Sequence, residues 1–157
     1  MKERPDPFVV SWSSAGSAAK HAGLSTHMVN YLCRHGIVVP SAGEERGRGK
    51  LRKYSFTDVL LLRVVAKLLS NGVSALRLRK SLVALRSRGE KGTQEILSKK
   101  YLVTDGFDIY FQDKGALEAL ETGQMSFAFV LELTGIRKDV AEKMGLRHKP
   151  QKKSVSQ

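Results

Sequence analysis

Polar side chains recur at the spacing of one helical face between residues 26 and 34. They are Thr26, His27, Asn30, Tyr31 and Arg34. Such groups hydrogen-bond or stack on a flat ring, which is the chemistry of recognition rather than of bond making. The amide of Asn30 could reach adenine, and its neighbours could face base edges and phosphates. The alternative is an ordinary helical hairpin packed in a core.

Basic side chains follow in the segment 41–53, SAGEERGRGKLRK. They are Arg46, Arg48, Lys50, Arg52 and Lys53. The segment has three glycines and no apolar cluster, which favours a β-hairpin wing that spans residues 44–53. Alternate basic side chains of such a wing would project toward a phosphate backbone. A disordered basic loop is the competing interpretation.

Candidate catalytic groups are sparse. The four histidines are scattered along the chain, and the sequence offers no nucleophile–base pair and no carboxylate pair in a cleft. Cys33 could bind a metal with His27 and His35, but these ligands are few, and Cys33 is expected on the apolar side of its helix, where it packs in the core. We therefore predict a protein that is not an enzyme and holds neither a metal nor a cofactor.

Two short helices are expected to position the polar face. They cover residues 17–22 and 26–35, with a turn at Gly23 and with Ser25 as the N-cap of the second helix. The apolar side of the second helix consists of Met28, Val29, Leu32 and Cys33. A helix–turn–helix with a polar, partly basic second helix has the shape needed to enter the DNA major groove, and Ser25 would then lie near DNA.

The clearest helix spans residues 54–71, YSFTDVLLLRVVAKLLSN. Ser55 or Thr57 can cap it, and Gly72 stops it. Its apolar residues leave little polar surface, so we predict that it is the central core helix. A further helix, capped by Ser74, is expected to extend to about residue 87, with leucines on one face and basic residues on the other.

Charge is distributed unevenly. The chain has 27 Lys+Arg against 15 Asp+Glu, a formal net charge of +12. Residues 1–90 hold 16 basic and 6 acidic residues, residues 101–136 hold 1 and 6, and the last 21 residues hold 7 and 2. A basic folded half attracts polyphosphate and releases its counterions, which favours DNA over a membrane surface. A merely solubilising surface is the plain alternative.

The cysteine count and the hydropathy pattern bear on location. The single cysteine excludes an intramolecular disulfide, and the sequence shows neither a membrane-spanning apolar run nor a signal-peptide pattern. We therefore expect a cytoplasmic, nucleoid-associated protein without a membrane partner.

Four patterns occur in order and at compatible spacings. The first is Ala19, Lys20, Gly23, Leu24 and Ser25; the second is Gly36, Ile37, Val38 and Pro40. The third is Arg52, Lys53, Tyr54, Ser55, Asp58 and Val59; the fourth is Gly72, Val73 and Ser74. Together they make the segment 10–88 similar to the DNA-binding domain of the MerR family of bacterial transcription regulators. That resemblance implies a helix–turn–helix, a two-stranded wing, a second helix pair and double-stranded DNA as partner.

The chain also departs from that family. The family's second helix usually carries arginine, two aromatics and an acidic residue, where this chain has Asn30, Tyr31, Leu32 and Cys33. Recognition would then rest more on His27, Asn30 and the wing. Gly89 and Gly92 interrupt the pattern where the family has a long dimerising helix. No cysteine follows Cys33, which argues against a metal sensor.

The residues after Gly92 are expected to form a second, small α/β unit. Residues 101–111, YLVTDGFDIYF, predict a β-hairpin with a type I′ turn at Asp105–Gly106. Residues 127–133, FAFVLEL, predict a third strand, and residues 137–144 a last helix. So small and apolar a sheet needs a partner surface, either the front domain or another copy of the chain. We favour a homodimer over a small-molecule pocket or a second protein, because regulators of this kind usually read two half-sites.

The predicted fold is α+β, mainly a helical winged helix–turn–helix followed by a small antiparallel β unit. Its expected divisions are a disordered N-terminus (1–9), a DNA-binding domain (10–90), the dimerisation or partner-binding unit (93–146) and a basic disordered tail (147–157). The predicted function is a sequence-specific transcriptional regulator that binds DNA as a dimer through the helix 26–35 and the wing 44–53. The alternative is an excisionase-like or antitoxin-like DNA-binding protein whose C-terminal unit docks a protein partner.

Overall fold

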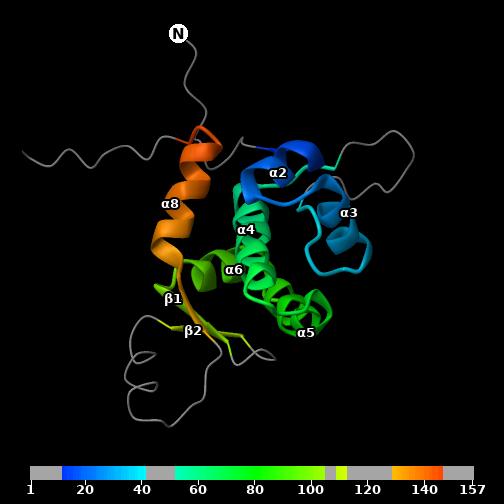
Figure 1. The fold of residues 1–157 in the computed structure, drawn as a ribbon. Helices are drawn as coiled ribbons and strands as arrows, with labels where there is room; N and C mark the ends of the chain where they lie inside the picture. The colour runs from blue at the N-terminus through cyan, green and yellow to red at the C-terminus, as the bar shows by residue number, and fades with distance from the viewer. Residues whose placement is uncertain (1–11, 42–51, 105–108, 113–128, 147–157) are drawn as a thin grey trace, which may run out of the picture.

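The computed structural model describes residues 12–41, 52–104, 109–112 and 129–146 (Figure 1). Several predictions therefore lie outside the described residues. They concern the N-terminus 1–9, the wing residues Arg46, Arg48 and Lys50, the turn at Asp105–Gly106, and the tail 147–157.

Helices dominate the described chain, and a small sheet follows most of them. In chain order the elements are α2 (Ala15–Ala22), α3 (Thr26–Arg34), α4 (Phe56–Ser70), α5 (Ala75–Arg86), α6 (Gly89–Leu97), β1 (Tyr101–Thr104), β2 (Ile109–Gln112), β3 (Phe129–Glu132) and α8 (Leu133–Lys143). The strands form one antiparallel sheet in the order β2-β1-β3. The predicted α+β class, mainly helical with a β unit after the helix–turn–helix, is confirmed.

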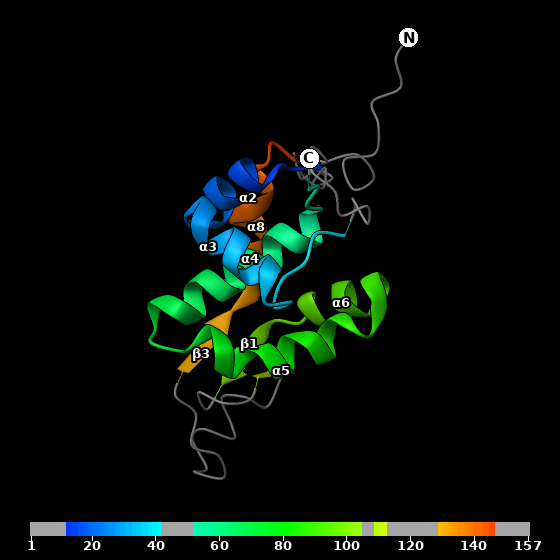
Figure 2. The same cartoon turned by 90° about the vertical axis from the view of Figure 1, so that its right-hand side faces the viewer.

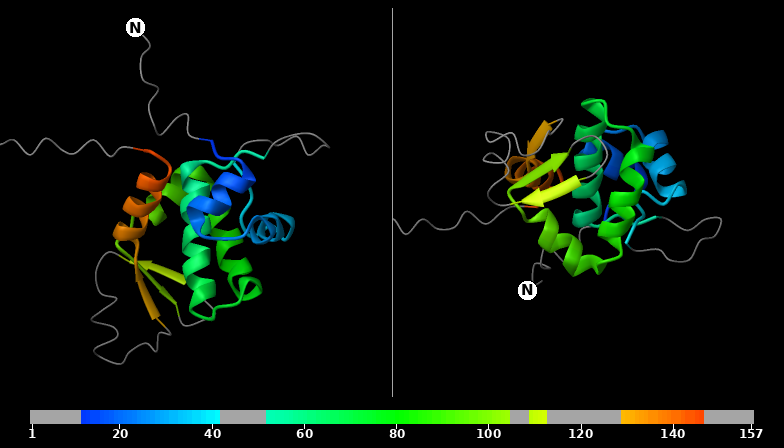
Figure 3. Two further views of the ribbon diagram at one scale, coloured as in Figure 1. Left: turned by 45° about the horizontal axis from the view of Figure 1, so that its top comes forward. Right: turned by 90° about the horizontal axis from the view of Figure 1, so that it is seen from below.

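Helix α4 is the centre of the molecule. Ten of its 15 residues are buried, and a helix that is apolar on every side must be covered on every side. Helix α3 lies on one side of α4 and α8 lies on the opposite side (Figures 1 and 3). Helix α2 packs against both α4 and α8, and α6 packs against α4 and α5 (Figure 2). The central role predicted for this helix is confirmed.

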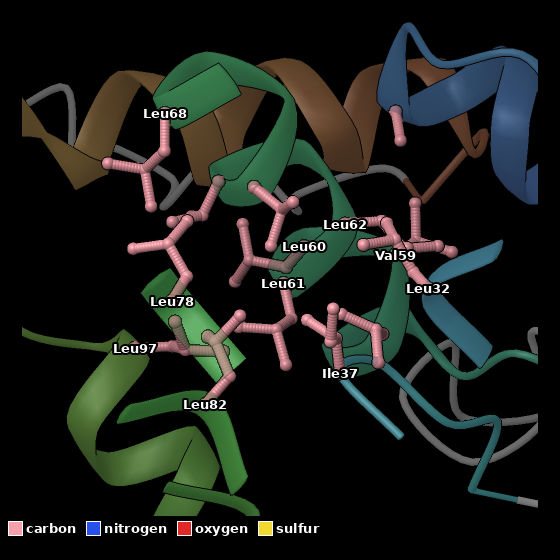
Figure 4. Packing of buried hydrophobic residues seen from close by; sticks show 14 of the residues in the cluster. Leu32, Ile37, Val59, Leu60, Leu61, Leu62, Leu68, Leu78, Leu82 and Leu97 are labelled. Carbon is pink, nitrogen blue, oxygen red and sulfur yellow. The ribbon is translucent and has the colours of Figure 1, made fainter. Parts of the chain in front are cut away.

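The buried cluster around α4 contains side chains from the helix–turn–helix and from the helix pair α5 and α6. Leu32 from α3 and Ile37 from the following segment lie beside Val59 and Leu62 of α4 (Figure 4). Leucines of α5 and α6 gather near Leu61 in the same view. They are Leu78, Leu82 and Leu97. The helix–turn–helix and the second helix pair therefore share one core.

Helix starts follow the local capping chemistry closely. Helix α2 begins at Ala15, two residues before the predicted start, because the Ser14 side chain accepts a hydrogen bond from the Ser17 amide at 3.2 Å. Helices α4 and α5 begin directly after Ser55 and Ser74, as expected. Ser74, however, makes no side-chain capping hydrogen bond, so its predicted capping contact is wrong.

The two glycines after α5 behave differently from each other. Gly89, with φ +80°, is the first residue of α6, and the helical path breaks between the end of α5 at Arg86 and this glycine, so the predicted interruption of a long helix is confirmed there. Gly92 instead lies within α6, where a Cβ atom would come within 2.7 Å of the Arg88 Cβ. It permits close packing rather than ending the helix, and the predicted interruption at Gly92 is wrong. No helix among the described residues has the length and apolar character needed to cross a bilayer.

The predicted hairpin is present as β1 and β2, but with a different register. Thr104 pairs with Ile109, whereas a two-residue turn at Asp105–Gly106 would pair Thr104 with Phe107. The hairpin is therefore confirmed and its predicted register is wrong. Register depends on which faces become buried in the tertiary structure, and turn signals alone do not determine it.

The third strand is shorter than predicted. β3 ends at Glu132, and the buried Leu133 is already the first residue of α8. The prediction of a strand through Leu133, with a helix beginning only at Arg137, is wrong on this boundary. A short apolar run fits a buried strand and a buried helix turn equally well.

The back unit, β1 to α8, packs on the helical part of the chain. α8 packs against α4, α2 and β1. Leu102, Leu133 and Val140 belong to the same buried cluster as the helix–turn–helix. The front helices are thus one of the two partner surfaces that the sequence led us to expect for this unit.

Candidate nucleic-acid interface

The start of α3 is fixed by the cap predicted from the sequence. The Ser25 hydroxyl accepts a hydrogen bond from the Met28 amide at 3.0 Å. Val29 and Leu32 are buried on the inner side of the helix. With one face held in the core, the polar face of α3 is directed away from α4.

The end of α3 is a tight, glycine-dependent stop. The Ile37 amide donates to the Leu32 carbonyl at 2.8 Å, and the Gly36 amide donates to the Cys33 carbonyl at 3.1 Å. This is the Schellman pattern, and it requires the left-handed conformation that Gly36 adopts at φ +66°. Because Ile37 is fully buried, the stop also anchors the chain that leads toward the wing.

The turn between α2 and α3 is supported from α4. Gly23 adopts φ +76°, and the Arg63 Nη1 of α4 donates to the Ala22 carbonyl at 3.0 Å. The Arg63 Nη2 lies 3.9 Å from an Asp139 carboxylate oxygen of α8. The turn that sets the angle of α3 is therefore connected through one guanidinium to the back unit.

Asp58 holds together Ser41 and Ser55, which flank the predicted wing. Its carboxylate accepts from the Ser41 amide at 2.8 Å, the Ser41 hydroxyl at 2.7 Å and the Ser55 amide at 2.9 Å. The Ser55 hydroxyl in turn accepts from the Asp58 amide at 3.1 Å, which completes a capping box. The residues before and after the wing are thus fastened to the first turn of α4.

The predicted binding residues divide into exposed and half-buried groups. The exposed residues are Ser25, Thr26, His27, Arg34, Arg52 and Lys53. Asn30 and Tyr31 are half-buried, and the Tyr31 ring packs on the core and against the His35 ring at 4.2 Å. Packing occupies part of Tyr31, so the polar groups around it are better placed to meet a ligand. Their roles at DNA stay predictions.

A direct contact joins α3 to Arg52, near the end of the predicted wing. The Arg52 Nη1 donates to the Asn30 Oδ1 at 2.9 Å, across 22 positions of sequence. This hydrogen bond brings the last basic residues of the wing beside the outer face of α3. Residues 12–41 contain no acidic residue, and the exposed charged side chains on and beside α3, Arg34, Arg52 and Lys53, are all basic.

Tyr54 marks the boundary between this face and the core. Its backbone N–H and C=O exchange 2.8 Å hydrogen bonds with Ser13, and its ring is fully buried. Its hydroxyl has no hydrogen-bond partner of normal geometry among the described residues. Burial raises the pKa of Tyr54 well above its ordinary value, and the neighbouring Cys33 raises that pKa further.

Cys33 therefore belongs to the packing beneath α3 and is half-buried there. Within the described ranges, no group of three or more His, Cys, Asp or Glu side chains could hold a metal ion.

Two residues that position the site, Asp58 and Arg63, were not among the predicted site residues. Asp58 was named only as part of the third family pattern, although the Ser55-x-x-Asp58 spacing is a capping-box signal. Arg63 carried a signal too, because it is an isolated charge within a run of apolar residues. A charge in such a place is retained only with polar partners.

The geometry described so far is that of a helix–turn–helix domain, and comparisons with known proteins agree. Residues 14–84 match the model of the MerR HTH family of regulatory proteins. Uncharacterized HTH-type transcriptional regulators of Mycobacterium bovis and Mycobacterium tuberculosis are 33% identical over 130 residues, which cover 78% of this chain and 56% of each relative. The chain spans about half the length of these curated relatives. Residues 14–84 form a helix–turn–helix domain of the MerR family, and the resemblance predicted from the sequence is confirmed.

Proposed function

We propose that this protein is a sequence-specific DNA-binding regulator of transcription. One observation carries the proposal: the outer face of α3 is polar, capped at its start and linked to the basic end of the wing by the Arg52–Asn30 hydrogen bond. The MerR-family match of residues 14–84 and the printed names of the mycobacterial relatives support the same function. This function is binding and requires no catalytic group.

Each part of the face has a role in this proposal. α3 enters the major groove, where Thr26, His27 and Asn30 meet base edges while the Ser25 end approaches a phosphate. A helix N-terminus favours such an anion through its free amides and dipole. Arg34, Arg52 and Lys53 neutralise backbone phosphates and release counterions, so affinity falls steeply with added salt. The remaining wing residues, Arg46, Arg48 and Lys50, are proposed to extend the phosphate contacts.

The finer part of the proposal is that the protein binds as a homodimer. Among the described residues, β2 and β3 each pair only with β1, so each has an edge that could pair with a second copy. Two copies related by a two-fold axis would place two α3 helices on half-sites about one helical turn apart. A dimer built on the back unit leaves the polar face of α3 on the opposite side of α4 free for DNA (Figure 3).

Footprinting on the DNA upstream of the protein's own operon tests the proposal. We expect two protected half-sites about 10 base pairs apart from centre to centre, with a complex whose mass by light scattering corresponds to two chains. Arg34→Ala should weaken binding, whereas Lys138→Ala, which removes an exposed charge on α8, should not.

Other outcomes would contradict the proposal in different ways. Equal affinity for unrelated duplexes would exclude a sequence-specific regulator. Clustered tandem sites would favour an excisionase-like architectural protein, and co-purification with the product of a neighbouring gene would favour an antitoxin-like protein.

A further inference from the structure

The hydrogen bond between the wing and α3 fixes which end of the Asn30 amide can meet a base. Arg52 Nη1 lies 2.9 Å from Asn30 Oδ1. A guanidinium has five N–H donors and no acceptor, so the atom facing it must be the amide oxygen. The amide nitrogen, with its two hydrogens, is therefore the end of Asn30 that Arg52 leaves unoccupied.

The charge of Arg52 also decides what the amide oxygen can accept. Adenine is recognised by an Asn whose oxygen accepts from N6 while its nitrogen donates to N7. Here a guanidinium already donates to that oxygen, and its positive charge disfavours the approach of a second donor such as adenine N6. The pair presents donors to the groove: the Asn30 amide hydrogens and the remaining guanidinium hydrogens.

A surface of donors fits one base best. Guanine exposes two acceptors, N7 and O6, at its major-groove edge, while adenine exposes one acceptor and one donor. Building on the proposed DNA-binding function, we propose that the Asn30–Arg52 pair reads guanine, with Asn30 donating to the base and Arg52 positioning the Asn30 amide. This replaces the contact with adenine that the sequence suggested for Asn30.

The pairing also changes the expected division of labour on this face. From the sequence, replacing Arg52 should weaken binding to all duplexes, and replacing Asn30 should relax specificity. With the two side chains joined, replacing either one removes the same base preference. Lys53, the next basic residue along the chain and also exposed, makes no such contact with Asn30 and serves as the matched control.

The test begins with selection of bound sites from a random duplex pool by the wild-type protein and by Asn30→Ala, Arg52→Ala and Lys53→Ala. We expect a guanine position in the wild-type site that is lost with Asn30→Ala and with Arg52→Ala but kept with Lys53→Ala. Replacing that guanine by adenine should weaken wild-type binding roughly 5- to 150-fold, the range of one good base contact. The same replacement should have little effect on either variant or on the double variant.

Base analogues locate the contact atom. Inosine keeps N7 and O6 and should preserve binding, whereas 7-deazaguanine lacks the N7 acceptor and should weaken it. Arg52→Lys keeps a positive charge but not the fixed fork of donors, so it should lose the guanine preference with a smaller loss of overall affinity. Thermal unfolding of each variant, expected to match the wild type because neither Asn30 nor Arg52 is fully buried, verifies that it is folded.

Two results would overturn the inference separately from the proposed function. A selected site in which Asn30 specifies adenine, independently of Arg52, would show that the amide oxygen is available to a base and would overturn the pairing alone. A wild-type protein that enriches no sequence would overturn the proposed function and this inference with it.

Discussion

Two arginines contact the helix–turn–helix from different places in the chain. Their hydrogen bonds are of similar length, but they differ in exposure and in the group that accepts the bond. Arg52, at the end of the wing, donates to the Asn30 side chain at 2.9 Å on the exposed face of α3. Arg63, in the middle of α4, donates to the Ala22 backbone carbonyl at 3.0 Å beside the turn. Similar hydrogen bonds therefore serve two regions of one motif, the surface that we propose meets DNA and the turn that sets the angle of α3.

The surroundings of each contact decide its role. Water competes for the Arg52–Asn30 bond, so its contribution to folding is small, while the Asn30 amide nitrogen and the remaining guanidinium hydrogens stay available to a ligand. Arg63 is mostly buried, its Nε has no hydrogen-bond partner among the described atoms, and its acceptor is backbone. The hydrogen bond of Arg63 therefore stabilises the fold rather than a complex with a ligand.

The largest expected effect on stability comes from a substitution at the turn that displaces the Arg63 guanidinium. In Gly23→Ala, the new Cβ would sit at a positive φ and 2.5 Å from the Arg63 Nη1. Backbone strain and displacement of the guanidinium should together lower the free energy of unfolding by about 2–4 kcal/mol, measured by denaturant titration. Gly16→Ala is the matched control, because nothing lies within 4 Å of its Cβ in α2. There alanine should stabilise by about 0.5–1 kcal/mol, and equal losses in both variants would contradict this account of the turn.

Exchanging the two arginines for alanine tests the contrast directly. Arg63→Ala should lower the free energy of unfolding by about 1–3 kcal/mol, because it leaves the Ala22 carbonyl without its partner. Arg52→Ala should change that free energy by less than about 0.5 kcal/mol while weakening DNA binding. Denaturant unfolding and DNA titration of both variants form the test. Under conditions where Arg63→Ala is folded, its DNA affinity should stay close to that of the wild type. A stability loss for Arg52→Ala as large as that for Arg63→Ala would erase the distinction.

The smallest expected effect lies at the boundary between the two regions. Tyr54→Phe removes a buried hydroxyl that lacks a good partner, so it should leave stability unchanged or raise it by up to about 1 kcal/mol. Because the pKa of Tyr54 is raised in the folded protein from its ordinary value of 10.0, the folded state retains the proton more strongly than the unfolded state. Below pH 10 this group adds no pH dependence, and above pH 10 wild-type stability should fall with rising pH.

The measurement is therefore the difference in unfolding free energy between wild type and Tyr54→Phe across this pH range. Other groups titrate in both proteins and largely cancel. The advantage of the variant should grow as pH increases above 10, and a difference that stays flat there would contradict the assigned burial of the hydroxyl.

Features that depend on a few neighbouring residues could be predicted from the sequence. Ser25 and Ser55 cap helices as expected, because capping is a contact across only three positions. Gly23 and Gly36 end α2 and α3 because only the local backbone must become left-handed. These local signals were enough to predict the helix–turn–helix, its polar face and the central helix.

Features that depend on distant residues could not be predicted. The register of Thr104 with Ile109 and the start of α8 at Leu133 follow from burial against helices far away in sequence. The partners of Arg52 and Arg63 lie 22 and 41 positions away, and no local spacing indicates them. The predicted site residues were named one by one, but the pairing that couples two of them required the fold. The predicted division between residues 10–90 and 93–146 stays a prediction.

The Asp58 carboxylate, by tying Ser41 to Ser55, has a consequence for how this protein can vary or be engineered. Both serines are hydrogen-bonded to Asp58 in the first turn of α4, so the chain between them is closed at its base whatever its length. The entropy of such a loop grows only logarithmically, and doubling its length costs about 0.6 kcal/mol. We therefore expect that the chain between Ser41 and Arg52 can be lengthened or shortened with little effect on the stability of the core, while Arg52 keeps its contact with Asn30.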